Sequence, residues 1–201
     1  MSNPRNSSSD VSASSAPSRP KATHTPSQGR TPSQTIGPFF HEALRWAGGE
    51  RVRFAEPGEA ITLTGRLLDG AGETLADSLI ETWQLSPSGK VPAAAASESH
   101  PHGLGRVETD KKGVFRIETL MPGSPAGGAP FIDVTVFARG LLKPLRTRVY
   151  LAEEARVRAD PLLKPLAGSP RISTLVAKRE GSVFHWDIRL QGVGETVFFT
   201  L

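Results

Sequence analysis

The sequence contains no cysteine and only one tyrosine, Tyr150, among its 201 residues. Without cysteine the chain has no disulfides, no thiolate metal ligands and no cysteine nucleophile. No segment approaches the roughly 18 apolar residues that a membrane span requires, and residues 1–30 lack the apolar core of a signal peptide. We therefore expect a soluble, unexported protein in the cytoplasm, where a reducing environment fits the missing cysteines.

Long runs of one charge are missing as well. The chain carries 24 Lys and Arg residues and 20 Asp and Glu residues, for a formal net charge of +4, and the two signs are interspersed along the sequence. A basic arm that binds nucleic acid usually shows about five or six like charges in succession. We therefore expect no nucleic-acid partner.

Familiar catalytic motifs are also absent. The chain has no G-x-S-x-G elbow of serine hydrolases, and residues 103–106 lack the third glycine and the helix of a dinucleotide site. His100 and His102 form the only close histidine pair, and two such side chains share a face in an extended segment. A metal pair is one reading and a surface loop is the other; no third ligand follows, which favours the loop. The residues alone predict no self-sufficient active site.

Composition divides the chain near residue 30. Residues 1–30 are rich in Ser and Pro and offer too little apolar surface to offset the entropy cost of ordering, so we predict a disordered extension. Residues 31–201 form the predicted domain, and residues 31–58 its N-terminal arm. Phe39 and Phe40 are expected to anchor this arm.

The domain alternates short apolar segments with turns, and its 20 glycines and 17 prolines favour strands over long helices. The predicted strands are residues 61–67, 79–83, 105–109, 114–119, 131–138 and 145–151. Asp110 to Gly113 is expected to close a hairpin with Gly113 at positive φ. Short helices are expected at residues 41–47 and 152–158, the second ended by Pro161.

The alternation is cleanest near the C-terminus. Apolar residues occupy every second position, which predicts one buried face: Phe184, Trp186, Ile188 and Leu190. Several short strands with these spacings predict an all-β fold, an antiparallel β-sandwich with short helical segments and long loops.

Arg139 is the candidate binding residue that the pattern indicates. It ends a mostly apolar strand and precedes Gly140, which allows close backbone approach. A guanidinium there can pair bidentately with a carboxylate or phenolate, as recognition of a small aromatic acid requires. The alternative is a solvated strand-end arginine, and the residues alone favour that alternative.

A set of motifs resembles a known family. They are Thr31-Pro-Ser-Gln-Thr-Ile-Gly-Pro-Phe39, Glu81-Thr-Trp-Gln84, Gly105-Arg106, Thr109-Asp110, Phe115-Arg116, Pro122-Gly123, Phe137-Ala-Arg-Gly140 and Gln191-Gly-Val-Gly-Glu-Thr-Val-Phe-Phe199. On these residues the chain, from about Thr31 to Leu201, resembles the intradiol ring-cleavage dioxygenases and, among them, the α (non-iron) subunits of protocatechuate 3,4-dioxygenase. The two ends of the match are its most specific parts.

The resemblance implies an αβ protomer of two β-sandwich chains. Only the β subunit of that family holds the non-haem Fe(III), through two tyrosines and two histidines. Here the histidine strand corresponds to Phe131-Ile132-Asp133, the tyrosine positions fall near Ala93 and near Ser124 or Pro125, and one tyrosine cannot supply two phenolates. We expect this chain to hold neither a metal nor a catalytic residue. The implied reaction cleaves 3,4-dihydroxybenzoate with O2 to 3-carboxy-cis,cis-muconate in aromatic-compound catabolism.

The resemblance also assigns this chain part of the substrate pocket. Thr35, Gly37 and Pro38 map onto an N-terminal segment that passes close to the iron. Arg139 maps onto a positive group that faces the anionic substrate, which reverses the preference stated above. The alternative function is a non-catalytic interaction or carrier domain of transthyretin-like type, whose strand pattern overlaps the middle of this chain.

Overall fold

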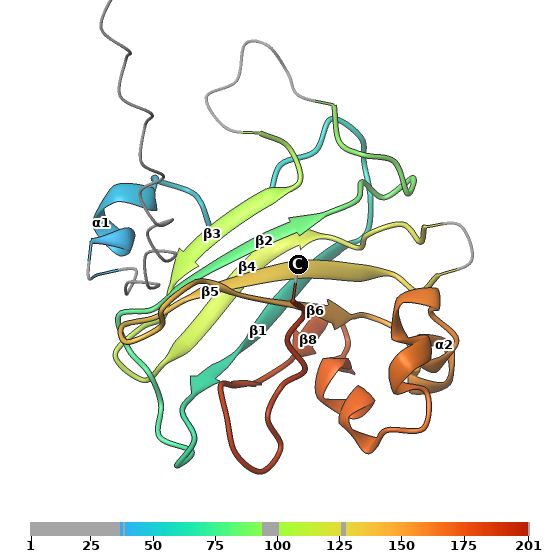
Figure 1. Cartoon of the computed structure of the whole chain (residues 1–201). Coiled ribbons are helices and arrows are strands. Elements are labelled where there is room, and N and C mark those ends of the chain that lie inside the picture. Colours follow the sequence, from blue (N-terminus) through green and yellow to red (C-terminus); the bar gives the residue numbers. More distant parts are fainter. Residues whose placement is uncertain (1–36, 38, 94–100, 126–127, 201) are drawn as a thin grey trace, which may run out of the picture. The chain divides into compact units, whose positions relative to one another are not determined.

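The computed structural model describes residues 37, 39–93, 101–125 and 128–200. The predicted extension, residues 1–30, lies outside the described residues, so its disorder stays a prediction. Two β-sheets form the framework of the described chain (Figure 1). The strands are β1 Ala60–Leu68, β2 Leu79–Gln84, β3 Leu104–Glu108, β4 Val114–Leu120, β5 Phe131–Phe137, β6 Leu145–Tyr150, β7 Lys178–Glu180, β8 Val183–His185 and β9 Ile188–Arg189.

The predicted β-sandwich is confirmed, with one difference in strand direction. One sheet has the order β3-β2-β5-β6, and all its neighbours are antiparallel. The other has the order β4-β1-β8-β7, with β9 also pairing with β1. In that sheet β1 is antiparallel to β4 but parallel to β8 and β9, so the sheet is mixed. All six strands predicted in the first part of the domain are present.

The predicted hairpin around Asp110 is wrong, although its turn is present. Gly113 adopts the expected positive φ of 70°, and its N–H donates to the Asp110 carbonyl. The strands on either side then separate, because β3 pairs with β2 in one sheet and β4 pairs with β1 in the other. The segment is therefore a corner that carries the chain between the two layers, and sequence pattern alone does not distinguish a corner from a hairpin.

The C-terminal alternation buries the face that the sequence predicts. Phe184, Trp186 and Ile188 are almost fully buried, at 2%, 4% and 0% exposure. The ladder to β1 is interrupted where the Trp186 carbonyl crosses Gly65: a Cβ at residue 65 would lie 1.8 Å from that oxygen. Glycine permits this close approach, and it splits one predicted strand into β8 and β9.

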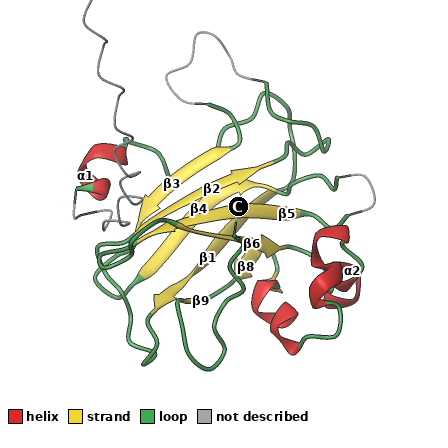
Figure 2. Cartoon of the chain, viewed as in Figure 1, coloured by secondary structure: helices red, strands yellow, loops and turns green. Residues whose placement is uncertain are grey.

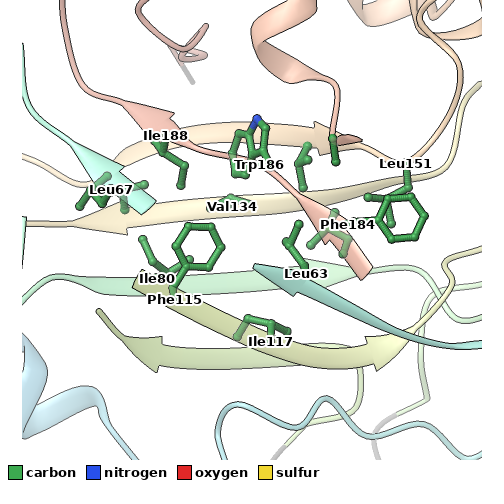
Figure 3. Packing of buried hydrophobic residues seen from close by; sticks show 14 of the residues in the cluster. Leu63, Leu67, Ile80, Phe115, Ile117, Val134, Leu151, Phe184, Trp186 and Ile188 are labelled. Atoms are coloured by element: carbon green, nitrogen blue, oxygen red, sulfur yellow. The ribbon is translucent and has the colours of Figure 1, made fainter. Parts of the chain in front are cut away.

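Side chains from both sheets fill the space between them (Figure 3). Ile80 and Val134 from one sheet face Leu63, Phe115 and Phe184 from the other. All five are at most 2% exposed. Burial of each such side chain contributes about 1.5–3 kcal/mol. This core fixes the two sheets against each other and so fixes the ends of their strands.

Short helices cover two regions, as Figure 2 shows. They are α1 Phe40–Leu44, α2 Glu154–Arg158 and the 3-10 helices η1 Pro161–Leu166 and η2 Pro170–Leu175. The first two confirm the predicted helices with shifted bounds: α1 begins one residue earlier and ends three residues earlier than predicted, and α2 begins two residues later. Pro161 follows α2 and starts η1, whose N-cap is Asp160. The last three cover a second apolar cluster around Tyr150. None of the helices in the described part of the chain has the length and apolar character to cross a membrane.

The close approach at Gly65 gives a stability prediction. Gly65→Ala should lower the free energy of unfolding by about 3 kcal/mol or more, because the new methyl group meets the backbone oxygen of Trp186. Urea denaturation measures this change. Gly168→Ala is the matched control, since no heavy atom lies within 4 Å of its added Cβ. Equal stabilities for the two variants would contradict the prediction.

Candidate functional site

One end of the β3-β2-β5-β6 sheet brings together segments that are far apart in the sequence. Leu79, the first residue of β2, pairs with Glu108 at the end of β3 on one side and with Phe137 at the end of β5 on the other. The loop that follows β5 therefore lies beside the segment that precedes β2. Arg139 is two residues beyond β5, so the register places it at this end of the sheet.

Arg139 is exposed and held only loosely. Its side chain is 61% exposed, and its Nη2 lies 3.9 Å from Oδ2 of Asp77, which is 67% exposed. Among the described residues Asp77 is the only one other than glycine with a positive φ, at 56°. An ion pair so open to solvent contributes about 0–1 kcal/mol. The Arg139 guanidinium is therefore available to an anion supplied from outside this chain.

The N-terminal arm reaches the same end of the sheet. Phe40, at the start of α1, is 4% exposed, and its ring stacks on Phe137 with centroids 6.2 Å apart. Phe39 is 69% exposed, so Phe40 is the aromatic anchor and Phe39 is not. Gly37, three residues before Phe40, has a φ of 79°, a conformation that glycine adopts without strain.

Of the four predicted binding residues, the structure therefore describes two. Gly37 and Arg139 belong to segments that meet through the contact of Phe40 with Phe137. Thr35 and Pro38 lie outside the described residues, and their roles stay predictions.

Sequence reasoning missed a second contact that holds the arm. Nη1 of Arg106, on β3, donates to the carbonyl oxygen of Leu44 at 2.5 Å, and the guanidinium carbon lies 4.7 Å from the centroid of the Trp46 ring. The Gly105-Arg106 dipeptide is part of the family resemblance, but nothing in its pattern indicates which segment the side chain contacts. That contact depends on how the arm folds over β3.

The positions that the resemblance equates with metal-binding histidines are Phe131 and Asp133, both on β5. Arg148, on the neighbouring strand β6, occupies the space beside both. Its Nε donates to Oδ1 of Asp133 at 2.8 Å, and its guanidinium carbon lies 3.4 Å from the centroid of the Phe131 ring. A cation of the chain itself therefore neutralises the only carboxylate at these positions.

Tyr150, at the end of β6, is packed as a core residue. It is 0% exposed, contacts the ring of Phe131 edge to face, and its hydroxyl has no hydrogen-bond partner among the described residues. Burial raises the pKa of its phenol to about 12, and the nearby positive charge of Arg148 opposes this shift only in part. The phenol therefore stays neutral at ordinary pH and is a poor source of a phenolate ligand.

Comparison with known proteins shows the family. The family model described as Dioxygenase matches residues 36–192. A protocatechuate 3,4-dioxygenase alpha chain from Pseudomonas putida is 38% identical over 191 residues, which cover 84% of this chain and 95% of that one. The chain belongs to the intradiol dioxygenase family. The resemblance seen in the sequence is thereby confirmed.

Further members of the family resemble this chain over most of its length. The protocatechuate 3,4-dioxygenase alpha chain of Burkholderia cepacia is 38% identical over 85% of this chain and 96% of its own. The beta chain from the same organism is 29% identical over 180 residues, 80% of this chain and 75% of its own. A solved intradiol ring-cleavage dioxygenase from Tetranychus urticae gives a TM-score of 0.56 at 15% identity, over 70% of this chain and 84% of that one. That likeness confirms the fold.

An intradiol dioxygenase implies a non-haem ferric ion, and the donor set described here does not fit one. His185 is exposed and lies 3.5 Å from Glu180, while His102 is buried in a turn. His100 lies outside the described residues, so the structure does not test whether it pairs with His102. In the described ranges no three His, Cys, Asp or Glu side chains come together. With Asp133 paired to Arg148, no residue described here is free to act as an anionic ligand at the family's metal position.

Replacing Tyr150 tests whether its hydroxyl has a bonding partner or the side chain only packs in the core. Tyr150→Phe should leave the free energy of unfolding unchanged or raise it, because no described residue, Arg148 included, makes a hydrogen bond of ordinary geometry to this buried hydroxyl. Urea denaturation measures the effect. A loss of 2 kcal/mol or more, on the order of an unsatisfied or broken hydrogen bond, would show that the hydroxyl has a partner.

Tyr150 also predicts a pH dependence. Its pKa is raised above the usual value of 10, so between pH 10 and about 12 the folded chain keeps a proton that the unfolded chain loses. Stability should be unaffected by this group below pH 10 and should fall as pH rises through about 12. As the chain has a single tyrosine, ultraviolet titration of the folded protein reads its pKa directly. A phenol that titrates at or below 10 would contradict its burial.

Proposed function

We propose that this chain is the α, non-iron subunit of a protocatechuate 3,4-dioxygenase. With a β subunit it would cleave 3,4-dihydroxybenzoate with O2 to 3-carboxy-cis,cis-muconate, in the breakdown of aromatic compounds. The observation that carries the proposal is the identity of 38% to two alpha chains of that enzyme, over nearly their whole lengths. We expect the assembled enzyme in the cytoplasm.

The proposal assigns the metal to the partner. A ferric ion held by the β subunit would supply the chemistry that activates the bound dihydroxy acid toward O2. The residues described here support that division of labour, because Asp133 is committed to Arg148 and Tyr150 is a buried neutral phenol. No step of the reaction is assigned to a side chain of this subunit.

The role of this subunit is to form a wall of the substrate pocket. Arg139 projects from the end of β5 with a largely exposed guanidinium, which suits the carboxylate of a dihydroxybenzoate bound at the interface. Gly37 lies on the arm that reaches the same end of the sheet, and its lack of a side chain lets the backbone approach a flat ring. Thr35 and Pro38, its neighbours on the arm, would complete the wall.

The transthyretin-like carrier is not favoured, because the curated relatives that match over most of this chain are chains of a dioxygenase. A carrier would act alone, whereas the proposed subunit requires a partner. Dependence of activity on a β chain therefore separates the two functions.

The division of labour can be tested by reconstitution. Purified alone, this chain should contain almost no iron and should not turn over protocatechuate. Co-expressed with a β chain, it should copurify as a complex with iron close to one ion per αβ pair and should show oxygen uptake with protocatechuate. Iron analysis and an oxygen electrode give both readouts. Stoichiometric iron in the isolated chain would contradict the proposal.

Arg139 can be tested in the same complex. Arg139→Ala should lower kcat/KM for protocatechuate by about 10- to 100-fold, the effect of losing one hydrogen bond to a charged group. The variant should lose much less with catechol, which lacks the carboxylate. Lys143→Ala is the matched control, since it removes an exposed cation from the same β5–β6 loop. Equal kinetics for the Arg139 variant and the unmodified complex would leave Arg139 as a solvated strand-end residue.

A further inference from the structure

All three nitrogens of the Arg106 guanidinium donate hydrogen bonds, and its flat face contacts a ring. Nε and Nη2 both donate to Oε2 of Glu81, the first at 2.9 Å, across the pair of strands β3 and β2. Nη1 donates to the carbonyl of Leu44, the last residue of α1, at 2.5 Å. The flat face of the group lies against the Trp46 ring. One side chain thus joins the body of the sheet to two points of the arm.

The backbone of Arg106 completes this joint. Its N–H donates to the carbonyl of Gly49 at 2.7 Å, and the Gly49 N–H donates to the carbonyl of Trp46. A Cβ at residue 49 would lie 2.4 Å from the Arg106 carbonyl oxygen, so the close contact requires glycine. Residues 44–49 therefore fold over Arg106 as a turn that is fixed by side chain and backbone together.

The ion pair of Arg45 with β3 is a weaker contact of this part of the arm, and the bonds of Glu50 and Val52 with Glu118 on β4 lie beyond it. Arg45 pairs with Glu108 at 2.7 Å, but the Arg45 side chain is 60% exposed, and such a surface pair contributes about 0–1 kcal/mol. The side chains of Arg106 and Glu81 are only 16% and 24% exposed. A charged pair that is shielded from water is screened less by salt. Removing one partner then costs more stability, because the other charge is left without its counter-ion.

We propose that Arg106 is the positioning residue of the substrate wall. It fixes the C-terminal end of α1, while Phe40 on Phe137 fixes the other end, so the arm reaches the end of the sheet beside Arg139 in one orientation. Glu81 accepts from Nε and Nη2 and neutralises the guanidinium, which leaves Nη1 and the flat face for the arm. This role rests on the proposed function, because it concerns the pocket wall that carries Gly37.

Three changes in the complex with the β chain separate positioning from simple stability. Arg106→Ala removes all side-chain contacts. Arg106→Lys keeps a cation beside Glu81 but loses the paired hydrogen bonds from Nε and Nη2 and the stacking on Trp46. The exchanged pair, Glu81→Arg with Arg106→Glu, restores an ion pair between β2 and β3, but its new carboxylate can neither donate to the Leu44 carbonyl nor stack on Trp46.

If Arg106 positions the arm, thermal stability (Tm) and catalytic efficiency (kcat/KM) should respond differently to these changes. Arg106→Ala should lower kcat/KM for protocatechuate about tenfold. The exchanged pair should regain most of the Tm lost in Arg106→Ala while kcat/KM stays low. In both Tm and kcat/KM, Arg106→Lys should lie between Arg106→Ala and the unmodified complex. Arg45→Ala, the matched control, removes another contact between the arm and β3 and should stay within about twofold of the unmodified complex. Recovery of both Tm and kcat/KM in the exchanged pair would overturn the proposal, as would a loss for Arg45→Ala equal to that for Arg106→Ala.

Hydrogen exchange tests the same joint without turnover. In Arg106→Ala and in the exchanged pair, the amides of residues 43–51 should exchange at least about tenfold faster than in the unmodified chain, whereas those of β4 should not change. Unchanged exchange in residues 43–51 would overturn the proposal even if activity fell. An unmodified complex without activity would instead contradict the proposed function. Hydrogen exchange would still show whether Arg106 fixes residues 43–51.

Discussion

The register of β2 is the constraint on which the site depends. Because Leu79 pairs with Glu108 on one side and Phe137 on the other, the end of β3, the start of β2 and the end of β5 share one end of a sheet. The core between the sheets holds this register, since a slip of one residue would turn Ile80 and Val134 toward solvent. Arg139 and the arm can meet there only while that register holds.

The outer face of this sheet carries charged pairs aligned across the strands, and each pair has a different consequence. Glu81 with Arg106 holds the arm at one edge. Asp133 with Arg148 lies at the positions that the family resemblance equates with metal-binding histidines. In both pairs an arginine binds a carboxylate on the neighbouring strand; on our proposals the first pair positions the arm and the second takes the place of a metal site.

Much of the fold could be predicted from the sequence because its signals are local. Alternating apolar residues located the strands, and Gly113 marked a turn with positive φ. The errors concern relations between distant segments. The corner after Asp110 and the parallel pairing of β1 with β8 depend on which sheet each strand joins, and no local pattern encodes that choice. The same holds for the candidate site: motif resemblance named Arg139 and Gly37 as candidates, whose roles stay predictions, but the contacts of Arg106 exist only once the arm has folded over β3.

On the proposed function, positions 131 and 133 differ from a metal site by more than two missing ligands. A carboxylate at Asp133 without a counter-ion would be costly on a half-buried face, and Arg148 removes that cost. The same guanidinium stacks on Phe131, so it excludes a ferric ion from this place by charge as well as by volume. Histidines introduced at 131 and 133 alone would still face Arg148. On the proposed function, these residues commit the chain to a role beside a metal held by its partner, and the arm and Arg139 are its proposed means of acting on a substrate.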